Sequence, residues 1–304
     1  MDHSESVNGI FLYPLISTKW GAYPNGAEAL ASTRVLDHGV VALLSTYHSD
    51  QMIAETARVS YGKGTKKTSN DNALIRYLLR HKHTSPFEMC EVLFYLKVPI
   101  FVARQLVRHR TANINEVSGR YSEMPEELYV PDETQLGPQS VVNNQGRSET
   151  AATLQTKRSQ LEITRATNDA FQSYDRLLTV NNVSKEISRI VLPLSTYTEL
   201  YWKCDIHNFF HFCRLRLDAH AQYEIRVMAQ AMFDAVVPFF PLATQAFEDY
   251  ILKTKTLSRT EQILLATMLS SATLPALDHA KALGMSEREH TEFVQWIQTL
   301  TSGE

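Results

Sequence analysis

A run of polar side chains at residues 108–122 contains many of the groups in this chain that are able to bind a charged ligand. Arginines and a histidine alternate there with amides, hydroxyls and one carboxylate, and only Ala112, Ile114 and Val117 are plainly apolar. Such a segment can be buried only if nearly every group is paired, so we expect a solvated loop or the lining of a site. Because arginine binds phosphate and carboxylate through planar, bidentate contacts, the pattern indicates a small molecule that carries phosphate.

Two further polar side chains, Arg216 and His220, lie four residues apart and would share one face of a helix. They stand in a region that is otherwise rich in aromatic residues. One interpretation is that they form salt bridges to acidic residues elsewhere, and the other is that they join residues 108–122 in one site. The sequence leaves both open.

A metal site is not expected. His207 and His211 have the spacing that can place two imidazoles on one metal ion. A zinc-protease motif would also need glutamate at position 208, where this chain has Asn208. Paired histidines that donate to a ligand or to the backbone are the preferred interpretation.

Nucleophilic catalysis by cysteine or serine has little support either. The chain has three cysteines, Cys90, Cys204 and Cys213, without a CxxC pair and in apolar or aromatic surroundings, which is typical of packed core residues. No Gly-x-Ser-x-Gly turn surrounds Ser118.

Composition excludes several classes of protein. The 304 residues are 44% hydrophobic and 21% charged, with a formal net charge of −3 and a pI near 6.4. This balance provides no general attraction to nucleic acid or to an anionic membrane. The N-terminus lacks a cationic segment followed by an apolar run, and no stretch approaches the ~20 apolar residues of a membrane span. We therefore expect a soluble, cytoplasmic protein with no nucleic-acid or membrane partner.

The first half of the chain reads as alternating strands and helices around these polar groups. We expect strands at 40–44 and 92–98 and helices at 50–59, 70–81 and 99–108. On the last helix Gln105, Arg108 and His109 would share one face. Ser85 and Glu88, with proline between them, have the form of a capping box. The glycine- and lysine-rich residues 61–67 do not fit a phosphate-binding P-loop and read as a solvated loop.

The second half is predicted to be mainly helical. Residues 131–150 read as a mobile loop or lid, followed by a long helix at 151–178. Residues 189–193 then lead to a strand or extended segment through about Lys203. A helical region follows at 205–237, with an irregularity near Asp218. Capping boxes at Ser258 and Ser286 begin further helices. We therefore divide the chain into a catalytic domain at 1–250 and a helical C-terminal extension at 251–304.

The polar segment resembles the signature of the flavin-dependent thymidylate synthases, which is Arg108-His109-Arg110, seven residues, and then Ser118. Five further blocks are similar to this family in the same order, and the resemblance runs from about residue 35 to 250. The blocks are residues 57–61 (Ala-Arg-Val-Ser-Tyr), 81–88, 99–105, 189–193 (Arg-Ile-Val-Leu-Pro) and 215–222 (Leu-Arg-Leu-Asp-Ala-His-Ala-Gln).

This resemblance implies a fold and a reaction. The fold would be α+β, with a mixed or antiparallel sheet flanked by helices. The reaction would convert dUMP to dTMP with 5,10-methylenetetrahydrofolate as carbon donor, FAD as redox carrier and NADPH as reductant, and it would release tetrahydrofolate. Members of the family are homotetramers that bind flavin between subunits, so the residues of one site would come from different chains.

The resemblance also assigns residues to the cofactor. Those expected to contact the flavin, its pyrophosphate or its adenosine end are Ser60, His83, Ser85, Glu88, Arg108, His109, Arg110, Thr111, Glu116, Asp205, His207, His211 and His220. Asp205 departs from the asparagine of some members, which puts flavin affinity in question. Asn113 replaces the serine of many members, but it lies within the variable stretch of the signature.

A second set of residues is assigned to dUMP by the same resemblance. The residues expected at its phosphate and sugar are Gln105, Arg108, Glu116, Ser118, Gly119, Arg120 and Arg189. Arg216 would lie at the pyrimidine, where a cation stabilises charge that develops on the ring. Arg216 and Ser118 are the candidate catalytic residues. No base adjoins Ser118 in the sequence, so phosphate binding is the more economical role for it.

Two alternatives remain at this stage. One is a phosphate- or nucleic-acid-binding module without catalysis, in which the basic residues hold a nucleic-acid backbone. The other keeps the fold but has lost the activity or acts on a related pyrimidine nucleotide.

Overall fold

The structure is a computed structural model that describes residues 6–7, 10–11, 29–61, 70–141, 145–148, 153–269 and 276–302. At its centre is a five-stranded sheet with the order β3-β4-β5-β7-β6, in which every neighbouring pair is antiparallel. Its strands are β3 (Ala31–Val35), β4 (Gly39–Tyr47), β5 (Glu91–Pro99), β6 (Asn113–Glu116) and β7 (Tyr197–Asp205). A separate pair, β1 (Ser6–Val7) and β2 (Ile10–Phe11), is also antiparallel. The expected α+β fold with an antiparallel sheet is confirmed.

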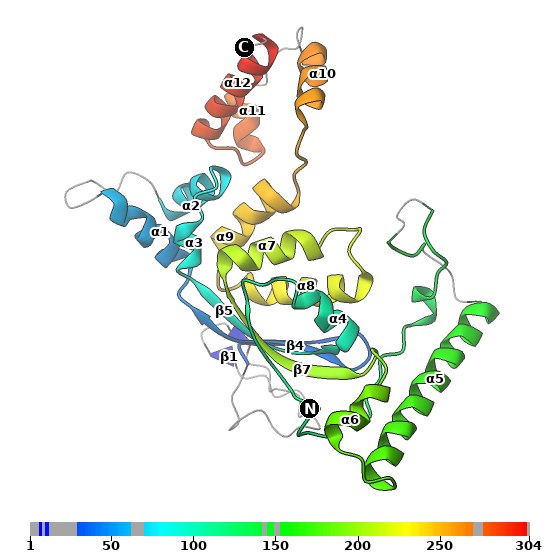
Figure 1. Cartoon of the computed structure of the whole chain (residues 1–304). Helices are drawn as coiled ribbons and strands as arrows, with labels where there is room; N and C mark the ends of the chain where they lie inside the picture. Colours follow the sequence, from blue (N-terminus) through cyan, green and yellow to red (C-terminus); the bar gives the residue numbers. More distant parts are fainter. Residues whose placement is uncertain are drawn as a thin grey trace.

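Helices surround this sheet (Figure 1). In the first half they are α1 (Asp50–Arg58), the 3₁₀ turn η2 (Val59–Tyr61), α2 (Asp71–Arg80), α3 (Ser85–Glu88), α4 (Ile100–Leu106) and the 3₁₀ turn η3 (Glu133–Gln135). Next come α5 (Leu154–Thr179), α6 (Lys185–Ser188), the 3₁₀ turn η4 (Arg189–Val191), α7 (Ile206–Arg216), α8 (Tyr223–Val236) and α9 (Pro241–Phe247). The π-helix η5 (Glu248–Leu252) is followed by α10 (Arg259–Leu269), α11 (Leu277–Ala282) and α12 (Glu287–Ser302).

The core lies between the sheet and helices α7 and α8, and its centre is aromatic. Phe94 on β5 packs against Trp202 on β7 and Phe209 on α7, with ring centroids 6.3 and 5.9 Å apart. Phe212, one turn further along α7, lies 5.4 Å from Trp202. All four side chains are almost completely buried. Burial of this much aromatic surface fixes the orientation of α7, and with it the polar residues on the other face of that helix.

Most of the predicted elements are confirmed. Helices α1, α2 and α5 and strands β4 and β5 occur where hydrophobic periodicity placed them, and the helical region at 205–237 is interrupted at residues 217–222, between α7 and α8. The predicted capping boxes at Ser258 and Ser286 are both formed. In the first, the Ser258 amide donates to Glu261 Oε2 (2.7 Å) and the Glu261 amide donates to Ser258 Oγ (3.3 Å). The same pair of bonds joins Ser286 and Glu289.

The predictions at 85–88 and 99–108 were wrong in detail. Thr84, not Ser85, is the residue that precedes α3, because its carbonyl already accepts from the amides of Phe87 and Glu88 (2.9 and 3.3 Å). Ser85 is therefore inside the helix and makes no capping box. Helix α4 ends at Leu106, so Arg108 and His109 follow its last turn and do not share a helical face with Gln105.

Residues 189–193 lead to a strand, β7, as predicted: Arg189 to Val191 form a 3₁₀ turn, and the backbone becomes extended at Leu192, whose conformation is restricted by Pro193. One other segment differs from the prediction. Within residues 108–122, Asn113 to Glu116 form the edge strand β6, paired with β7. Its side chains are polar and exposed except for the partly buried Ile114, so the sequence pattern did not indicate a strand. The segment from 131 to 150 contains η3 and a bridge between Gln139 and Arg147.

The interpretations of the N-terminal residues and of most of the loop at 61–67 fall outside the described residues. The predicted extension is helical, and Figure 1 shows α10 to α12 beyond α2 and α9, away from the sheet. Among the described residues, no helix is both long enough and apolar enough to cross a membrane.

Candidate functional site

The polar residues after α4 meet the end of α7. His109 is only 8% exposed, and its ring lies edge-on to Phe212 with centroids 5.0 Å apart. Arg216, the last residue of α7, donates from Nε to His109 Nε2 (3.0 Å) and from Nη2 to the carbonyl of Gln105 (3.4 Å). A ring nitrogen that accepts from a guanidinium carries no proton. Burial first, and then Arg216 and His211, lower the pKa of His109 to about 4, so the imidazole is neutral at pH 7.

A third segment closes this cluster. The side chain of Gln105 donates to Gln222 Oε1 (2.5 Å), and Gln222 is the residue that precedes α8. The sequence assigned no role to Gln222, although it ends the block at 215–222. The break between α7 and α8 therefore places Gln222 beside Gln105 of α4.

The charge of this region is not compensated. Arg108 and Arg110 are exposed and Arg216 is partly buried. Within the described part of the chain, no carboxylate lies within ion-pair distance of any of the three. Three guanidinium groups on neighbouring segments thus favour an anionic ligand.

A second cluster lies where the polar segment passes η4. Gly119 is buried, and a Cβ atom there would lie 3.2 Å from Arg189 Cδ and 3.2 Å from Met124 Sδ. Glu116 on β6 accepts from Thr198 Oγ1 (2.6 Å). Glu116, Gly119 and Arg189 line one cavity of about 150 Å³. The structure therefore brings together three of the residues expected at dUMP.

Ser118 and Arg120 belong to the same turn. Ser118 Oγ accepts from the Arg120 amide (3.3 Å), and among the described residues it has no histidine or carboxylate partner that would act as a base. Arg120 forms an exposed ion pair with Glu186 (3.0 Å). This geometry is unfavourable for a serine nucleophile and compatible with phosphate binding.

A third group is carried by the short elements next to α1. Ser60 lies in η2, His83 follows α2, and Ser85 and Glu88 lie in α3; all four are exposed. Helix α1 contacts η2, α2 and α3, which gathers these residues on one side of the molecule. Within the described residues, no hydrogen bond or ion pair links this group to residues 108–122.

The remaining candidates lie on and after α7. Asp205 caps this helix by accepting from the Asn208 amide (2.8 Å), and its other oxygen accepts from the Asn208 side chain (2.6 Å). Each carboxylate oxygen thus accepts one hydrogen bond and keeps a further lone pair, and the cap fixes the first turn of α7, which carries His207. His211 lies 6.2 Å from His109, between ring centroids. His220 is exposed and contacts Asp218 (2.8 Å). Thr111 is exposed on the turn before β6.

Alternative chemistries find no support here. Cys90, Cys204 and Cys213 are buried with free thiols. Burial raises the pKa of Cys90 to about 12 and the pKa values of the other two well above the ordinary range. The described residues contain no group of three or more His, Cys, Asp or Glu side chains that would hold a metal ion.

Comparison with known proteins identifies the family. Residues 42–242 match the sequence model described as thymidylate synthase complementing protein. The chain belongs to the flavin-dependent thymidylate synthase family. It is 46% identical over 265 residues to the flavin-dependent thymidylate synthase of Ruegeria pomeroyi, with 85% of each chain covered. It is 44% identical over 261 residues to that of Ehrlichia ruminantium, with 86% of each covered.

A solved structure supports the same assignment. The UMP/dUMP methylase PolB from Streptomyces cacaoi, bound with 5-Br dUMP, is similar with a TM-score of 0.65 and 34% identity. The match covers 72% of this flavin-dependent thymidylate synthase family member and 99% of PolB. The family predicted from the five sequence blocks is thus confirmed, and the chain is an enzyme rather than a binding module without catalysis.

Proposed function

We propose that this enzyme methylates dUMP to dTMP, with 5,10-methylenetetrahydrofolate as carbon donor, FAD as redox carrier and NADPH as reductant, and that it releases tetrahydrofolate. The observation that carries the proposal is the cluster of Gln105, His109 and Arg216, where uncompensated cations meet a neutral, oriented imidazole. It stands inside the region that matches the family, whose relatives are named for thymidylate synthesis. We also propose that the enzyme is cytoplasmic.

The residues present fit FAD. Its pyrophosphate needs cations, and the exposed Arg108 and Arg110 have no carboxylate partner in the described part of the chain. Its adenosine end needs polar side chains, and the exposed Ser85 and Glu88 make no side-chain hydrogen bond to any described residue. Bound FAD supplies the hydride chemistry, which no protein side chain provides. We assign to it Ser60, His83, Ser85, Glu88, Arg108, His109, Arg110, Thr111, Asp205, His207, His211 and His220.

The chain's own contribution is then positioning and electrostatics. Glu116, Ser118, Gly119 and Arg189 hold the phosphate and sugar of dUMP around the cavity that three of them line. Arg216 faces the pyrimidine. Its Nε bond to His109 fixes the plane of the guanidinium, so that its remaining N–H groups stabilise negative charge on the ring without reorganisation.

Release of tritium from 5-labelled dUMP, in the presence of methylenetetrahydrofolate and NADPH, tests this function. We expect release together with dTMP formation from protein that shows the visible absorbance of bound flavin. Flavin-loaded protein that releases no tritium would contradict the proposal. Release of label from UMP at a higher rate than from dUMP would show that the substrate is a related nucleotide.

Replacement of Arg216 by lysine tests the role of the guanidinium. Lysine keeps the charge but cannot donate from Nε to His109 while also presenting a planar pair of donors. We expect kcat to fall on the order of 100-fold, as for loss of one donor to a developing anion, with flavin still bound. Arg214→Lys, an exposed substitution on the same helix, is the matched control and should retain activity. Equal activity of the two variants would remove Arg216 from the catalytic machinery.

A further inference from the structure

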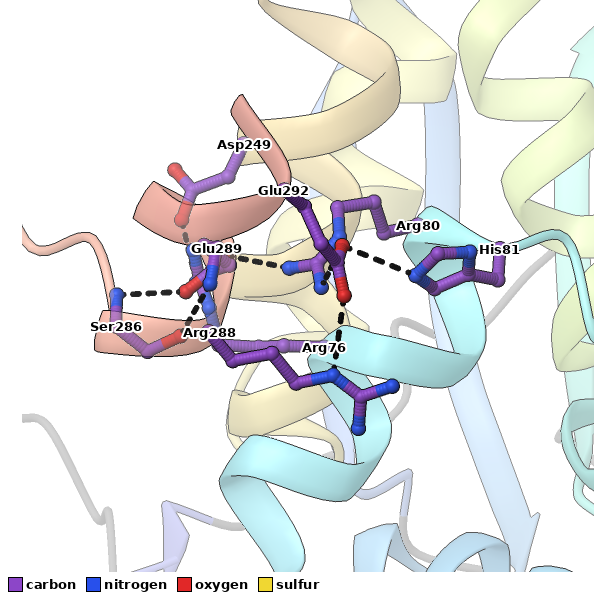
Figure 2. A network of polar contacts seen from close by, with 8 residues as sticks. All are labelled: Arg76, Arg80, His81, Asp249, Ser286, Arg288, Glu289 and Glu292. Carbon is purple, nitrogen blue, oxygen red and sulfur yellow. Dashed lines mark hydrogen bonds and ion pairs between the residues drawn. The ribbon is translucent and has the colours of Figure 1, made fainter. Parts of the chain in front are cut away.

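The C-terminal extension is attached to the catalytic domain through charged side chains of α2 and α12 (Figure 2). Glu289, only 8% exposed, lies 3.0 Å from Arg80 Nη1 and 3.4 Å from Arg76 Nη2. Glu292, one turn later, lies 2.7 Å from Arg80 Nη2 and 3.3 Å from His81 Nε2. Arg76 also pairs with Asp249 of η5 (2.6 Å). A cavity of about 730 Å³ is lined by residues of both α2 and the extension, and these polar contacts join the two elements beside it.

Aromatic contacts continue from this interface to a residue of the expected cofactor site. The Arg288 guanidinium, which also pairs with Glu292 (3.0 Å), lies 4.0 Å above the Tyr77 ring. Tyr77 in turn packs on His81, with centroids 4.3 Å apart, and stacks on His83, with centroids 6.0 Å apart and planes 26° apart. The extension thus contacts Tyr77, on which the His83 ring stacks, and His81, which packs on the same tyrosine.

The backbone that carries His83 needs this support. Helix α2 ends in a Schellman turn, in which the His83 amide donates to the Leu78 carbonyl (2.9 Å) and the Lys82 amide donates to the Leu79 carbonyl (3.1 Å). The left-handed position of such a turn is usually glycine, but here it is Lys82, with φ of 58°. A side chain in this conformation is strained by about 1 kcal/mol. Contacts that hold Tyr77 and His81 therefore help to keep the turn formed.

We propose that the C-terminal extension positions the adenosine-binding turn, with Arg288 and Glu292 acting as positioning residues for His83. The proposal rests on the function proposed above, in which His83, Ser85 and Glu88 contact the adenosine end of FAD. It assigns the extension a part in cofactor affinity: a chain whose α12 is not docked on α2 binds FAD more weakly.

Flavin titration of the full-length protein, after removal of bound flavin, tests the proposal with Arg288→Leu. The substitution removes the cation above Tyr77 and leaves an apolar leucine side chain in its place. We expect the Kd for FAD to rise about 2- to 5-fold, the equivalent of one cation–π contact. The Kd for FMN, which has the same ring system but no adenosine, should not change. Arg259→Leu, an exposed arginine at the start of α10, is the matched control and should alter neither Kd. Arg288→Lys should restore FAD affinity.

The outcomes separate this inference from the proposed function. Wild-type protein that binds neither flavin contradicts the function, and the inference fails with it. Wild-type binding of FAD with no change in Arg288→Leu overturns the inference alone. Equal weakening of FAD and FMN shows a general structural effect and also overturns it. If Arg288→Leu does not fold, Glu292→Gln, which keeps the size of the side chain, must show the same selective loss of FAD affinity.

Discussion

At the scale of single residues, burial and the contact with Arg216 together keep His109 neutral. The imidazole accepts from the guanidinium (3.0 Å), so protonation of His109 would place two cations in contact inside a region with little solvent. The histidine of the signature is therefore neutral. It orients Arg216 by accepting its hydrogen bond, and it is not available as a general acid near neutral pH.

This arrangement predicts how stability depends on pH. Because the folded-state pKa of His109 is lowered from 6.5 to about 4, the unfolded chain binds more protons in this window, and stability falls as the pH falls from 6.5 to 4. The contribution is on the order of 2 to 3 kcal/mol. In urea unfolding at a series of pH values, the free energy of unfolding of His109→Asn should fall less steeply than that of the wild type between pH 6.5 and 4. The exposed His279→Asn is the control and should follow the wild type. Parallel curves for wild type and His109→Asn would disprove the assignment.

The buried cysteines predict a reaction without a thiol nucleophile. Burial raises the pKa of Cys90 to about 12, so almost no thiolate is present at neutral pH and the sulfur is not exposed to substrate. Cys90→Ala should therefore retain turnover in the tritium-release assay, with a stability loss of about 1 kcal/mol from lost packing. An inactive Cys90→Ala protein that still folds and binds flavin would refute this prediction.

The residue types at the site were largely predictable, but their partners were not. The signature and the five other blocks indicated Arg108, His109, Ser118 and Arg216 from the sequence. The pairing of Gln105 with Gln222 joins positions more than a hundred residues apart, and no local pattern reports such a contact. The neutral state of His109 likewise depends on a partner that only the fold supplies.

At the scale of elements, α7 connects the core to the site. Phe209 and Phe212 face the aromatic core, and Arg216 follows Phe212 one turn later on the same face, whereas His211 is exposed. Phe212 also contacts the ring of His109. Packing of this helix thus sets the position of Arg216 and of the imidazole that accepts from it.

Phe212→Leu tests this connection. We expect a loss of about 1 to 2 kcal/mol in the free energy of unfolding, together with weaker flavin binding, because the His109 ring loses its edge contact. Phe240→Leu, equally buried but without a ring contact to His109, should destabilise the protein to a similar extent and leave the flavin Kd unchanged. Urea denaturation and flavin titration of both variants provide the measurement. Weaker flavin binding in both would indicate a general loss of order.

Elements with strong local signals were predictable, and those defined by distant partners were not. The apolar periodicity of α2 and the run of apolar residues in β5 were sufficient to predict these two elements. The capping boxes likewise predicted helices of the extension. Strand β6 has exposed polar side chains apart from the partly buried Ile114, and only its hydrogen bonds to β7 make it a strand. The cap of helix α3 is Thr84, one residue before the predicted cap, because the Thr84 carbonyl, and not the Ser85 hydroxyl, receives the first amides.

At the scale of the whole molecule, the assigned residues occupy separate regions of one chain. In the described part of the chain, no polar contact joins Ser60, His83, Ser85 and Glu88 to residues 108–122. Many of these side chains are also exposed. Both facts support the proposal that the enzyme is a homotetramer in which different subunits complete each site. Neither composition nor hydrophobic pattern reports such an assembly.

Subunit mixing measures whether sites are shared. Sedimentation should show a tetramer, and two variants that each have low activity, Arg216→Lys and Glu88→Gln, should together regain activity above that of either one when they are unfolded and refolded as a mixture. Shared sites place both substitutions in some sites and neither in others. Separately refolded samples that are mixed without exchange serve as the control. Mixed tetramers without recovered activity would show that each site lies within one subunit.

The pairing of β6 with β7 also has a consequence for the order of folding. Strands β3 and β4 are joined by a short turn, whereas β6 at Asn113–Glu116 meets its partner at Tyr197–Asp205 only after α5 has been made. Closure of a long loop is entropically costly and slows the contacts that depend on it. The signature segment therefore reaches its native register late, when the nascent chain is already about two-thirds complete. A shorter nascent chain contains the signature without the strand that holds it in place, so we expect it not to bind flavin.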